Sequence, residues 1–459
     1  MLFNSIEYIF FFFPAVFILV KLISLFNYNF LSKVSLIGAS LYFYSFWNIK
    51  FLPLILFSVL GNLFFIKFLE KKKINLFLQI LFNLFLLFVF KYTDFTINQV
   101  NFVFNKNIEL LEMAFPLALS FFTFQQISSA VDLFQRRKKI KIVDYFLYVT
   151  FFPQLIAGPI VLLDHFEKQI KKIKKGLNFR NIYIGLFIFF LGLFKKNILA
   201  DTFGNFVNKG FDNFETLSFL ISWLVSLAWT LQFYFDFSGY TDMAIGSALI
   251  LNIVLPLNFN SPLKSYSVIE FWKKWHISLG IFIQNYMYYP ILKITKNLTF
   301  PKSLLALILI MTLIGLWHGP NFTFIFFGFL HGVALAINYV FKKLNISLNK
   351  IVAWIITFNF INISFLVFRS ENLSQFFEIL KTMMGINKSS FYSLKIFSLS
   401  EVFFLTLFVL GGLIICLTQK NSNYFIVNKN KNPNVYLMGF IICISLIFLN
   451  SKEFLYFKF

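Results

Sequence analysis

A histidine placed where a helix must break is the clearest candidate for chemistry in this sequence. His318 lies directly before the helix-breaking pair Gly319-Pro320, between one apolar run and the next. At such a break an imidazole can project into a cavity, and a carbonyl freed from helical pairing can fix its tautomer. Trp317 and Asn321 flank the break and are candidates for positioning a substrate. A histidine held in this way can act as a general base on a hydroxyl or thiol, the minimum that acyl transfer requires.

A second cluster combines another histidine with aromatic and basic residues. In the stretch EFWKKWHISLGIFIQNYMYYP at 270–290, apolar side chains recur at three- or four-residue steps, so we expect an amphipathic helix at the membrane interface. Trp272, Trp275 and the two lysines would anchor that helix among the lipid headgroups. Taken alone, His276 fits an interfacial polar residue as well as a catalytic one.

A third cluster places carboxylates among apolar residues, in QFYFDFSGYTD at 232–242. Each ionisable group at membrane depth is a candidate for function, because burying it is costly. In a helix, Asp236 and Tyr240 would lie one turn apart and could share a hydrogen bond, while Asp242 falls on another face. The alternative, that these groups cap the ends of a broken helix, stays open. It fits Asp242 better than Asp236, which has Phe on either side.

The two remaining histidines are weaker candidates. His331 follows His318 at about 220° around a helix, and a proline interrupts the path between them, so the two need not share a site. His165 stands beside Asp164 in a basic loop, which favours a solvated role.

Motifs for other chemistries are absent from the sequence. It has no HExxH, GxSxG, P-loop or GxGxxG, and no cysteine near a histidine, so we predict no metal site and no serine hydrolase. Cys416 and Cys443 both lie in apolar runs and indicate neither a disulfide framework nor a zinc site.

Composition determines which elements must position these residues. The chain has 459 residues, of which 59% are hydrophobic and 13% charged, against roughly 45–50% and 25% in soluble domains. Its mean hydropathy is +0.76, and a soluble protein of this size cannot hide that much apolar surface. The net charge of +22 sits in short clusters between apolar runs, as the positive-inside bias and anionic headgroups select. We therefore expect an integral membrane protein and no binding to nucleic acid.

Eleven segments are long and apolar enough to be membrane spans. Four more segments, at 113–131, 142–163, 243–257 and 277–292, are short or interrupted by proline and polar residues, and such backbone must be enclosed by protein. We expect one domain over 1–459, with a catalytic core at about 113–341 and peripheral helices at 1–90 and 351–450. The eleven expected spans are 6–26, 31–47, 51–69, 74–90, 182–199, 217–235, 303–316, 322–341, 351–368, 402–417 and 435–449.

The N-terminus and the basic loops give an expected topology. The first 22 residues lack a basic leading region and a small-residue cleavage site, so we expect a retained membrane helix. If the basic clusters at 70–73, 138–141 and 168–175 all face the cytoplasm, the N-terminus lies outside.

Three stretches together resemble the membrane-bound O-acyltransferase family, and within it the bacterial branch that O-acetylates alginate, peptidoglycan and other envelope polysaccharides. They are QFYFDFSGYTDMAIG at 232–246, LPLNFNSPLKSYSVIEFWKKWHISL at 255–279 and GLWHGPNFTFIFFGFLHG at 315–332. The opening residues and FFPQLIAGPI at 151–160 extend the likeness from residue 1 to about residue 340. Beyond that point only the pattern of apolar spans agrees.

The resemblance implies an all-α, polytopic fold, a ring of about 11–13 helices with short or re-entrant ones around a central funnel. It points to His318 as the central histidine and to His276 as a second polar position facing it. This branch usually carries Arg-Asp where the sequence has Gln284 and Asn285, so we expect a neutral hydrogen bond in place of that charge pair. A pair of glycines that commonly follows the next proline is also absent after Pro290.

The implied activity is transfer of an acetyl group from a cytoplasmic donor, acetyl-CoA, with no tightly bound cofactor. The protein would sit in the bacterial inner membrane and pass the group to an extracytoplasmic SGNH-type acetyltransferase partner, for O-acetylation of peptidoglycan or an alginate-like polymer. The alternative is a polysaccharide or proton-coupled transporter whose carboxylates and histidines form a relay, although no inverted repeat supports it. A purely structural subunit is a third possibility if His318 is dispensable.

Overall fold

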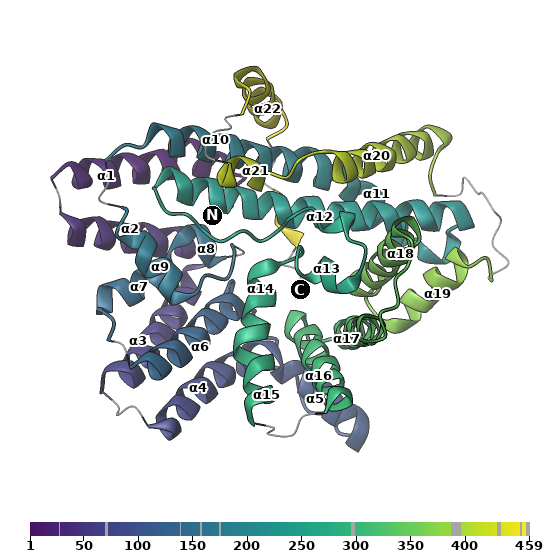
Figure 1. The fold of residues 1–459 in the computed structure, drawn as a ribbon, viewed down its shortest axis with the longest axis horizontal. Coiled ribbons are helices and arrows are strands. Elements are labelled where there is room, and N and C mark those ends of the chain that lie inside the picture. Colours follow the sequence, from purple (N-terminus) through teal and green to yellow (C-terminus); the bar gives the residue numbers. More distant parts are fainter. Residues whose placement is uncertain are drawn as a thin grey trace. The chain divides into compact units, whose positions relative to one another are not determined.

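The computed structural model describes residues 1–26, 28–68, 72–137, 139–156, 158–173, 176–294, 299–386, 396–428, 433–449 and 452–455, and every regular element in them is a helix (Figure 1). Nine helices among these residues are long and apolar enough to cross a bilayer. They coincide with nine of the eleven expected spans. The other two are α2 (Asn29–Ser45), of 17 residues, and α22 (Val435–Ile447), of 13. The predicted all-α, polytopic membrane class is confirmed.

The chain forms two compact units. Unit 1 comprises residues 1–192, 240–257 and 428–453, and unit 2 comprises residues 193–239, 258–427 and 454–459. Two helices, α10 (Phe179–Phe194) and α12 (Phe219–Ile250), contribute residues to both units.

Two helices, the largely buried α6 and the half-exposed α2, make many of the helix contacts in unit 1. α2 packs against α1 and α7, and α6 packs against α3 and α4. Besides α2, α10 and α22, its elements are η1 (Glu7–Phe12), α1 (Phe13–Leu25), η2 (Ile49–Phe51), α3 (Leu52–Phe68), α4 (Lys73–Lys91), α5 (Thr93–Phe104), α6 (Leu119–Arg136), α7 (Ile142–Thr150), α8 (Phe152–Leu155) and α9 (Leu163–Ile170).

Buried amides join α3, α4 and α6 inside unit 1. Asn62 and Asn83 exchange side-chain hydrogen bonds of 3.0 and 2.8 Å, and Gln79 Nε2 donates to Asn62 Oδ1 at 3.0 Å. Gln126 Nε2 on α6 donates to Ser58 Oγ at 2.8 Å. Polar side chains at membrane depth need such partners because hydrocarbon offers none.

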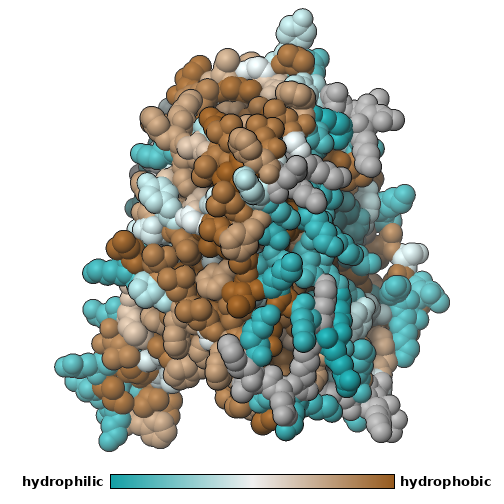
Figure 2. Space-filling model, turned by 90° about the vertical axis from the view of Figure 1, so that its left-hand side faces the viewer, coloured by the Kyte–Doolittle hydropathy of each residue, from teal (hydrophilic) through white to brown (hydrophobic). Residues whose placement is uncertain are grey.

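Many large apolar side chains are exposed on the surface of the protein. Exposed apolar side chains recur on the outer helices, with Leu22 at 52% and Phe85 at 59%. On the face shown in Figure 2, hydrophobic side chains cover a broad area and hydrophilic ones gather toward one side. This is the surface expected of helices that contact lipid.

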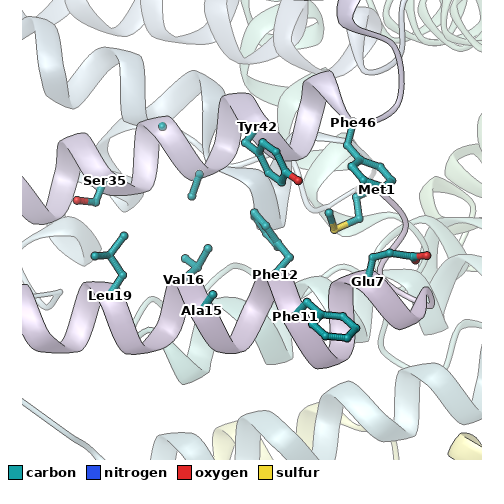
Figure 3. Close-up of a pocket in the computed structure, with 12 residues that line it drawn as sticks. Met1, Glu7, Phe11, Phe12, Ala15, Val16, Leu19, Ser35, Tyr42 and Phe46 are labelled. Carbon is teal, nitrogen blue, oxygen red and sulfur yellow. The ribbon is translucent and has the colours of Figure 1, made fainter.

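A groove of about 660 Å³ lies in unit 1 between the helix formed by η1 and α1 and the neighbouring α2 (Figure 3). Small residues keep it open: Ala15 on α1 faces Ser35, Gly38 and Ala39 on α2. A side chain added at Gly38 would meet nothing within 4 Å. None of the predicted site residues lines this groove.

Unit 2 contains the closest helix pair of the described chain, α16 (Phe300–His318) and α17 (Phe322–Lys343). α17 also packs against α13 and α18, and α18 against α19. The other elements are η3 (Lys195–Ala200), α11 (Asp201–Asp212), η4 (Phe214–Thr216), η5 (Pro262–Lys264), α13 (Val268–Trp272), α14 (Ile277–Phe282), η6 (Ile283–Tyr288), α15 (Tyr289–Ile294), α18 (Lys350–Arg369), α19 (Leu373–Met383), α20 (Leu399–Thr418) and α21 (Asn423–Val427).

Two glycines allow α16 and α17 to meet backbone to backbone. A Cβ on Gly315 would overlap the carbonyl oxygen of Phe324 and lie 2.9 Å from the Cα of Gly328, and a Cβ on Gly328 would overlap the carbonyl oxygen of Met311. Because the obstacles are backbone atoms, no side-chain rotation relieves them. Small residues at such crossings are how membrane helices approach closely.

Replacing Gly315 with Ala should therefore lower stability by about 1–3 kcal/mol, the usual cost of overpacking. Thermal unfolding of the detergent-solubilised protein measures this. Gly411→Ala on α20 is the matched control, because a Cβ there meets nothing within 4 Å and alanine favours a helix. Equal melting temperatures for the two variants would contradict the close crossing.

Candidate active site

His318 is the last residue of α16, and α17 begins at Phe322, so the predicted helix break is confirmed. The imidazole is buried, at 6% exposed, among rings. Its ring centre lies 4.9 Å from that of Trp317, 5.2 Å from Phe368 and 6.2 Å from Phe327. The chain therefore places this histidine in an aromatic enclosure at a helix end.

His276 does not lie in a continuous amphipathic helix as expected. Its φ of 44° puts it in the left-handed region, directly before α14 begins at Ile277, whereas α13 has already ended at Trp272. The extended segment 258–260 fixes this break, since Asn260 N–H donates to the Lys274 carbonyl and Ile277 N–H to the Asn258 carbonyl, both at 2.9 Å. A non-glycine residue in this conformation is strained and persists only where its surroundings impose it.

The His276 side chain is only 1% exposed, so protein encloses it. Its Nδ1 lies 3.2 Å from Asn258 Oδ1, and its ring meets Phe237 edge-on at 4.9 Å. Within the described residues its Nε2 atom is buried without a hydrogen-bond partner. Burial lowers the pKa of His276 to about 3, so the imidazole is neutral at physiological pH.

Aromatic rings connect the surroundings of the two histidines. Phe237, which contacts His276, lies 6.4 Å from Phe233, and Phe233 lies 5.1 Å from Phe368, which contacts His318. All five residues belong to unit 2. Aromatic rings therefore line the path between the two histidines, and surroundings of low polarity strengthen a hydrogen bond formed among them.

His331 is held in place at both ring nitrogens. Trp272 Nε1 donates to His331 Nδ1 at 3.1 Å, so the proton of the neutral ring is on Nε2. His331 Nε2 donates to Ser364 Oγ at 3.0 Å, and Ser364 Oγ donates to the Ile361 carbonyl at 2.8 Å. Because both ring nitrogens are hydrogen-bonded, His331 has a structural role. Trp272 donates its hydrogen bond to this histidine and not to a lipid headgroup.

Asp236 is in an ion pair that the sequence did not reveal. Lys196 Nζ lies 2.7 Å from both Asp236 Oδ1 and Asp201 Oδ1, and the Leu455 N–H donates to Asp236 Oδ2 at 3.1 Å. Lys196 and Asp236 are 2% and 1% exposed. Lys196 lies in the π-helical turn η3, a feature frequent at functional sites. Because Lys196 and Asp236 are forty residues apart in the sequence, no local spacing predicted this pair.

α12 is one unbroken helix of 32 residues across the predicted break. The alternative that its carboxylates cap a broken helix is therefore wrong, and the expected separation of spans 217–235 and 243–257 is replaced by a single long helix. Tyr240 and Asp242 are buried in its unit 1 part, where the Tyr240 ring lies 4.9 Å from that of Phe3.

Trp275 and Asn321 make packing and capping contacts. Trp275 packs against Phe271, Phe259 and Phe365 at 5.0–5.6 Å between ring centres. Asn321 caps α17 through the Thr323 N–H at 3.1 Å and donates to the Glu371 carbonyl at 2.7 Å.

A cavity of about 270 Å³ in unit 2 has Trp272 in its wall, next to His331. The side chains of Lys273 and Gln284 add polar atoms to it. Apolar side chains form most of the rest: Ile269, Ile277, Ile281, Ile283, Leu307, Met311 and Leu335. Across the described residues, no three His, Cys, Asp or Glu side chains are grouped as metal ligands.

A sequence model of the membrane-bound O-acyltransferase family matches residues 36–395. A peptidoglycan O-acetyltransferase of Helicobacter pylori is 40% identical over 426 residues, 84% of this chain and 80% of that protein. The chain belongs to the membrane-bound O-acyltransferase family. The resemblance predicted from the motifs is confirmed, and this membrane-bound O-acyltransferase is a multi-pass membrane enzyme.

Other relatives act on different envelope polymers. A probable alginate O-acetylase of Pseudomonas aeruginosa is 32% identical over 407 residues, 84% of this chain and 75% of that protein. A teichoic acid D-alanyltransferase of Bacillus subtilis is 25% identical over 271 residues, 56% of this chain and 69% of that protein.

For the ion pair of this O-acyltransferase, we expect Lys196→Met to cost about 3–5 kcal/mol, because it leaves the buried Asp236 carboxylate without its counter-charge. The double variant Lys196→Met with Asp236→Asn should recover most of that loss, since no buried charge then remains at 236. Thermal unfolding in detergent measures both. A double variant no more stable than the single one would contradict a buried, mutually neutralising pair.

Proposed function

We propose that this O-acyltransferase takes an acetyl group from acetyl-CoA at the cytoplasmic face of the bacterial inner membrane and passes it outward for O-acetylation of an envelope polysaccharide. Peptidoglycan or an alginate-like polymer is the acceptor. The observation that carries this proposal is the identity with an acetyltransferase of peptidoglycan over four fifths of that protein's length. A second relative is named as a probable O-acetylase of alginate. That reaction also acetylates hydroxyl groups of a polysaccharide.

The buried imidazoles suit the proton step of this transfer. An acceptor hydroxyl attacks the thioester carbonyl, a histidine takes the hydroxyl proton, the C–S bond breaks, and the proton passes to the leaving thiolate. His318 is assigned as the central histidine by its place in the family motif, and His276 as a second base. A neutral imidazole is required for this role, and burial keeps His276 neutral.

Lys273 supports binding of the donor. Its side chain lines the unit 2 cavity, whose other walls are mostly apolar. A lysine is a point charge suited to phosphate, and the CoA donor carries phosphates on a flexible chain. No tightly bound cofactor is needed, because acetyl-CoA is consumed as a substrate.

An extracytoplasmic partner with an SGNH-type acetyltransferase domain would complete the transfer to polysaccharide. The chain itself carries neither a GxSxG nor a GDS-like nucleophile motif. The proposed enzyme therefore moves the acetyl group across the membrane, and the partner places it on the polymer.

Replacing His318 with Ala should abolish O-acetylation of the envelope, since removing a general base costs roughly 10²–10⁴-fold. His276→Ala should give a partial loss. Mass spectrometry of released polysaccharide measures acetylation, and immunoblotting of membranes confirms normal insertion. The control is His165→Gln, because the side chain of His165 bonds the carbonyl of Val254, which is not one of the predicted site residues. Normal acetylation in the His318 variant would refute the assignment.

Purified protein in liposomes should transfer acetyl from acetyl-CoA on one face to a hydroxyl acceptor on the other without moving intact sugar. Radiolabelled acetyl-CoA and a labelled oligosaccharide, supplied separately, distinguish the two fluxes. The reason is that a polysaccharide transporter must carry the sugar itself, whereas a relay carries only the acetyl group. Sugar flux without acetyl transfer would favour the transporter alternative.

A further inference from the structure

Asn258 is a fully buried amide that no sequence motif singled out as functional. It lies in the extended segment that pins the backbone of His276. Three groups converge on its side-chain oxygen: Ser278 Oγ donates at 2.8 Å, the Ser278 N–H donates at 3.2 Å, and His276 Nδ1 lies 3.2 Å away. This oxygen is therefore the fixed point of the local hydrogen-bond network.

The backbone of Ser278 decides which atom of the amide points toward the ring. A peptide N–H can only donate, so the Asn258 atom that it meets must be the oxygen and not the nitrogen. That same oxygen faces His276 Nδ1. An amide oxygen can only accept, so His276 must carry its proton on Nδ1.

It follows that His276 Nε2 holds a lone pair. That atom is buried and has no hydrogen-bond partner among the described residues. His331 has the opposite arrangement, with its proton on Nε2 and both nitrogens occupied. Of these two buried histidines, only His276 has a basic nitrogen ready to accept a proton.

We propose that Asn258 is a positioning residue that holds His276 in the Nδ1–H tautomer and so exposes the basic Nε2 for acyl transfer. Its role would be that of the orienting group behind a general base, in which the third residue fixes tautomer and ring direction. The catalytic part of this inference rests on the proposed function. The tautomer part does not.

The charges near His276 leave this assignment undisturbed. On α12, Asp236 precedes the contacting Phe237 and is paired with Lys196. On the chain leading to His276, Lys274 is paired with Glu270 at 2.6 Å. Burial is the cause that lowers the pKa of His276, and no charged side chain contributes to the shift. The side-chain hydrogen-bond partner of the ring is the neutral amide of Asn258.

Nitrogen NMR of the full-length protein in nanodiscs, with ¹⁵N-labelled histidine rings, tests the tautomer directly. The chain has only four histidines, so substituting one at a time assigns each signal. We expect His276 to show a protonated Nδ1 and an unprotonated Nε2 between pH 5 and 8. A protonated Nε2 in the unaltered protein would overturn the proposal.

Two substitutions at 258 separate tautomer control from simple packing. Asn258→Leu keeps the size but offers no acceptor, so the ring should lose its fixed tautomer and acetyl transfer should fall to about the same partial level as in His276→Ala. Asn258→Asp keeps the acceptor, so the Nδ1–H form and activity at high pH should both be retained. Asn362→Leu is the matched control, since Asn362 is also fully buried and bonds a hydroxyl, Thr230 Oγ1, at 2.7 Å.

The Asp variant also predicts a change in pH dependence. A carboxylate beside Nδ1 stabilises the imidazolium and should raise the pKa of His276 by roughly 1–3. Activity of Asn258→Asp should then be lost at a higher pH than in the unaltered enzyme as the pH falls, because the protonated ring cannot accept a proton. A purely structural role of Asn258 would leave this profile unchanged and so refute the positioning role.

The two readouts keep the inferences apart. If Asn258→Leu leaves the His276 signals as they were, the tautomer assignment is wrong. If the signals change as expected while acetyl transfer is unaffected, the tautomer assignment stands and the catalytic role of His276 is refuted. If no variant, the unaltered protein included, transfers acetyl, the proposed function fails and the NMR result still decides the tautomer.

Discussion

Hydrocarbon cannot hydrogen-bond, and this single constraint explains how the polar residues of this chain are arranged. An unpaired polar group away from water costs several kcal/mol by transfer measures, so most such groups in the interior have found each other. The amides of Asn62, Gln79 and Asn83 pair inside unit 1. In unit 2, Lys196 neutralises Asp236. Against this background an atom left without a partner, such as His276 Nε2, is informative.

The site depends on two departures from regular helix, each with a local cause. His318 ends α16, and the glycine contact between Gly315 and Gly328 brings α17 close enough for Phe327 to reach the imidazole. His276 occupies a left-handed conformation imposed by its pairing with the extended segment before it. Both histidines therefore lie at helix ends. Backbone groups there lack helical hydrogen-bond partners and are available to orient a side chain.

Periodicity and composition were sufficient to predict the membrane class, nine of the spans and the helix break at His318. They failed where the outcome depends on contacts distant in sequence. SGY in α12 was taken for a possible break, yet the helix continues, because packed neighbours override the weak propensity of single Ser and Gly residues. Lys196 lies in an apolar helix forty residues from Asp236. Asn258 lies in an extended segment whose sequence has no hydrophobic periodicity. Only the folded chain reveals the partners of these two residues.

Gln284 and Asn285 stand where related sequences of this branch usually carry a charge pair. Here Gln284 Nε2 donates to the Tyr289 hydroxyl at 2.6 Å, and both side chains are exposed. Because Gln284 also lines the unit 2 cavity, the wall beside Trp272 keeps only Lys273 as a formal charge. Among the residues that line this cavity no carboxylate competes with Lys273, which is the arrangement that the proposed anionic donor requires.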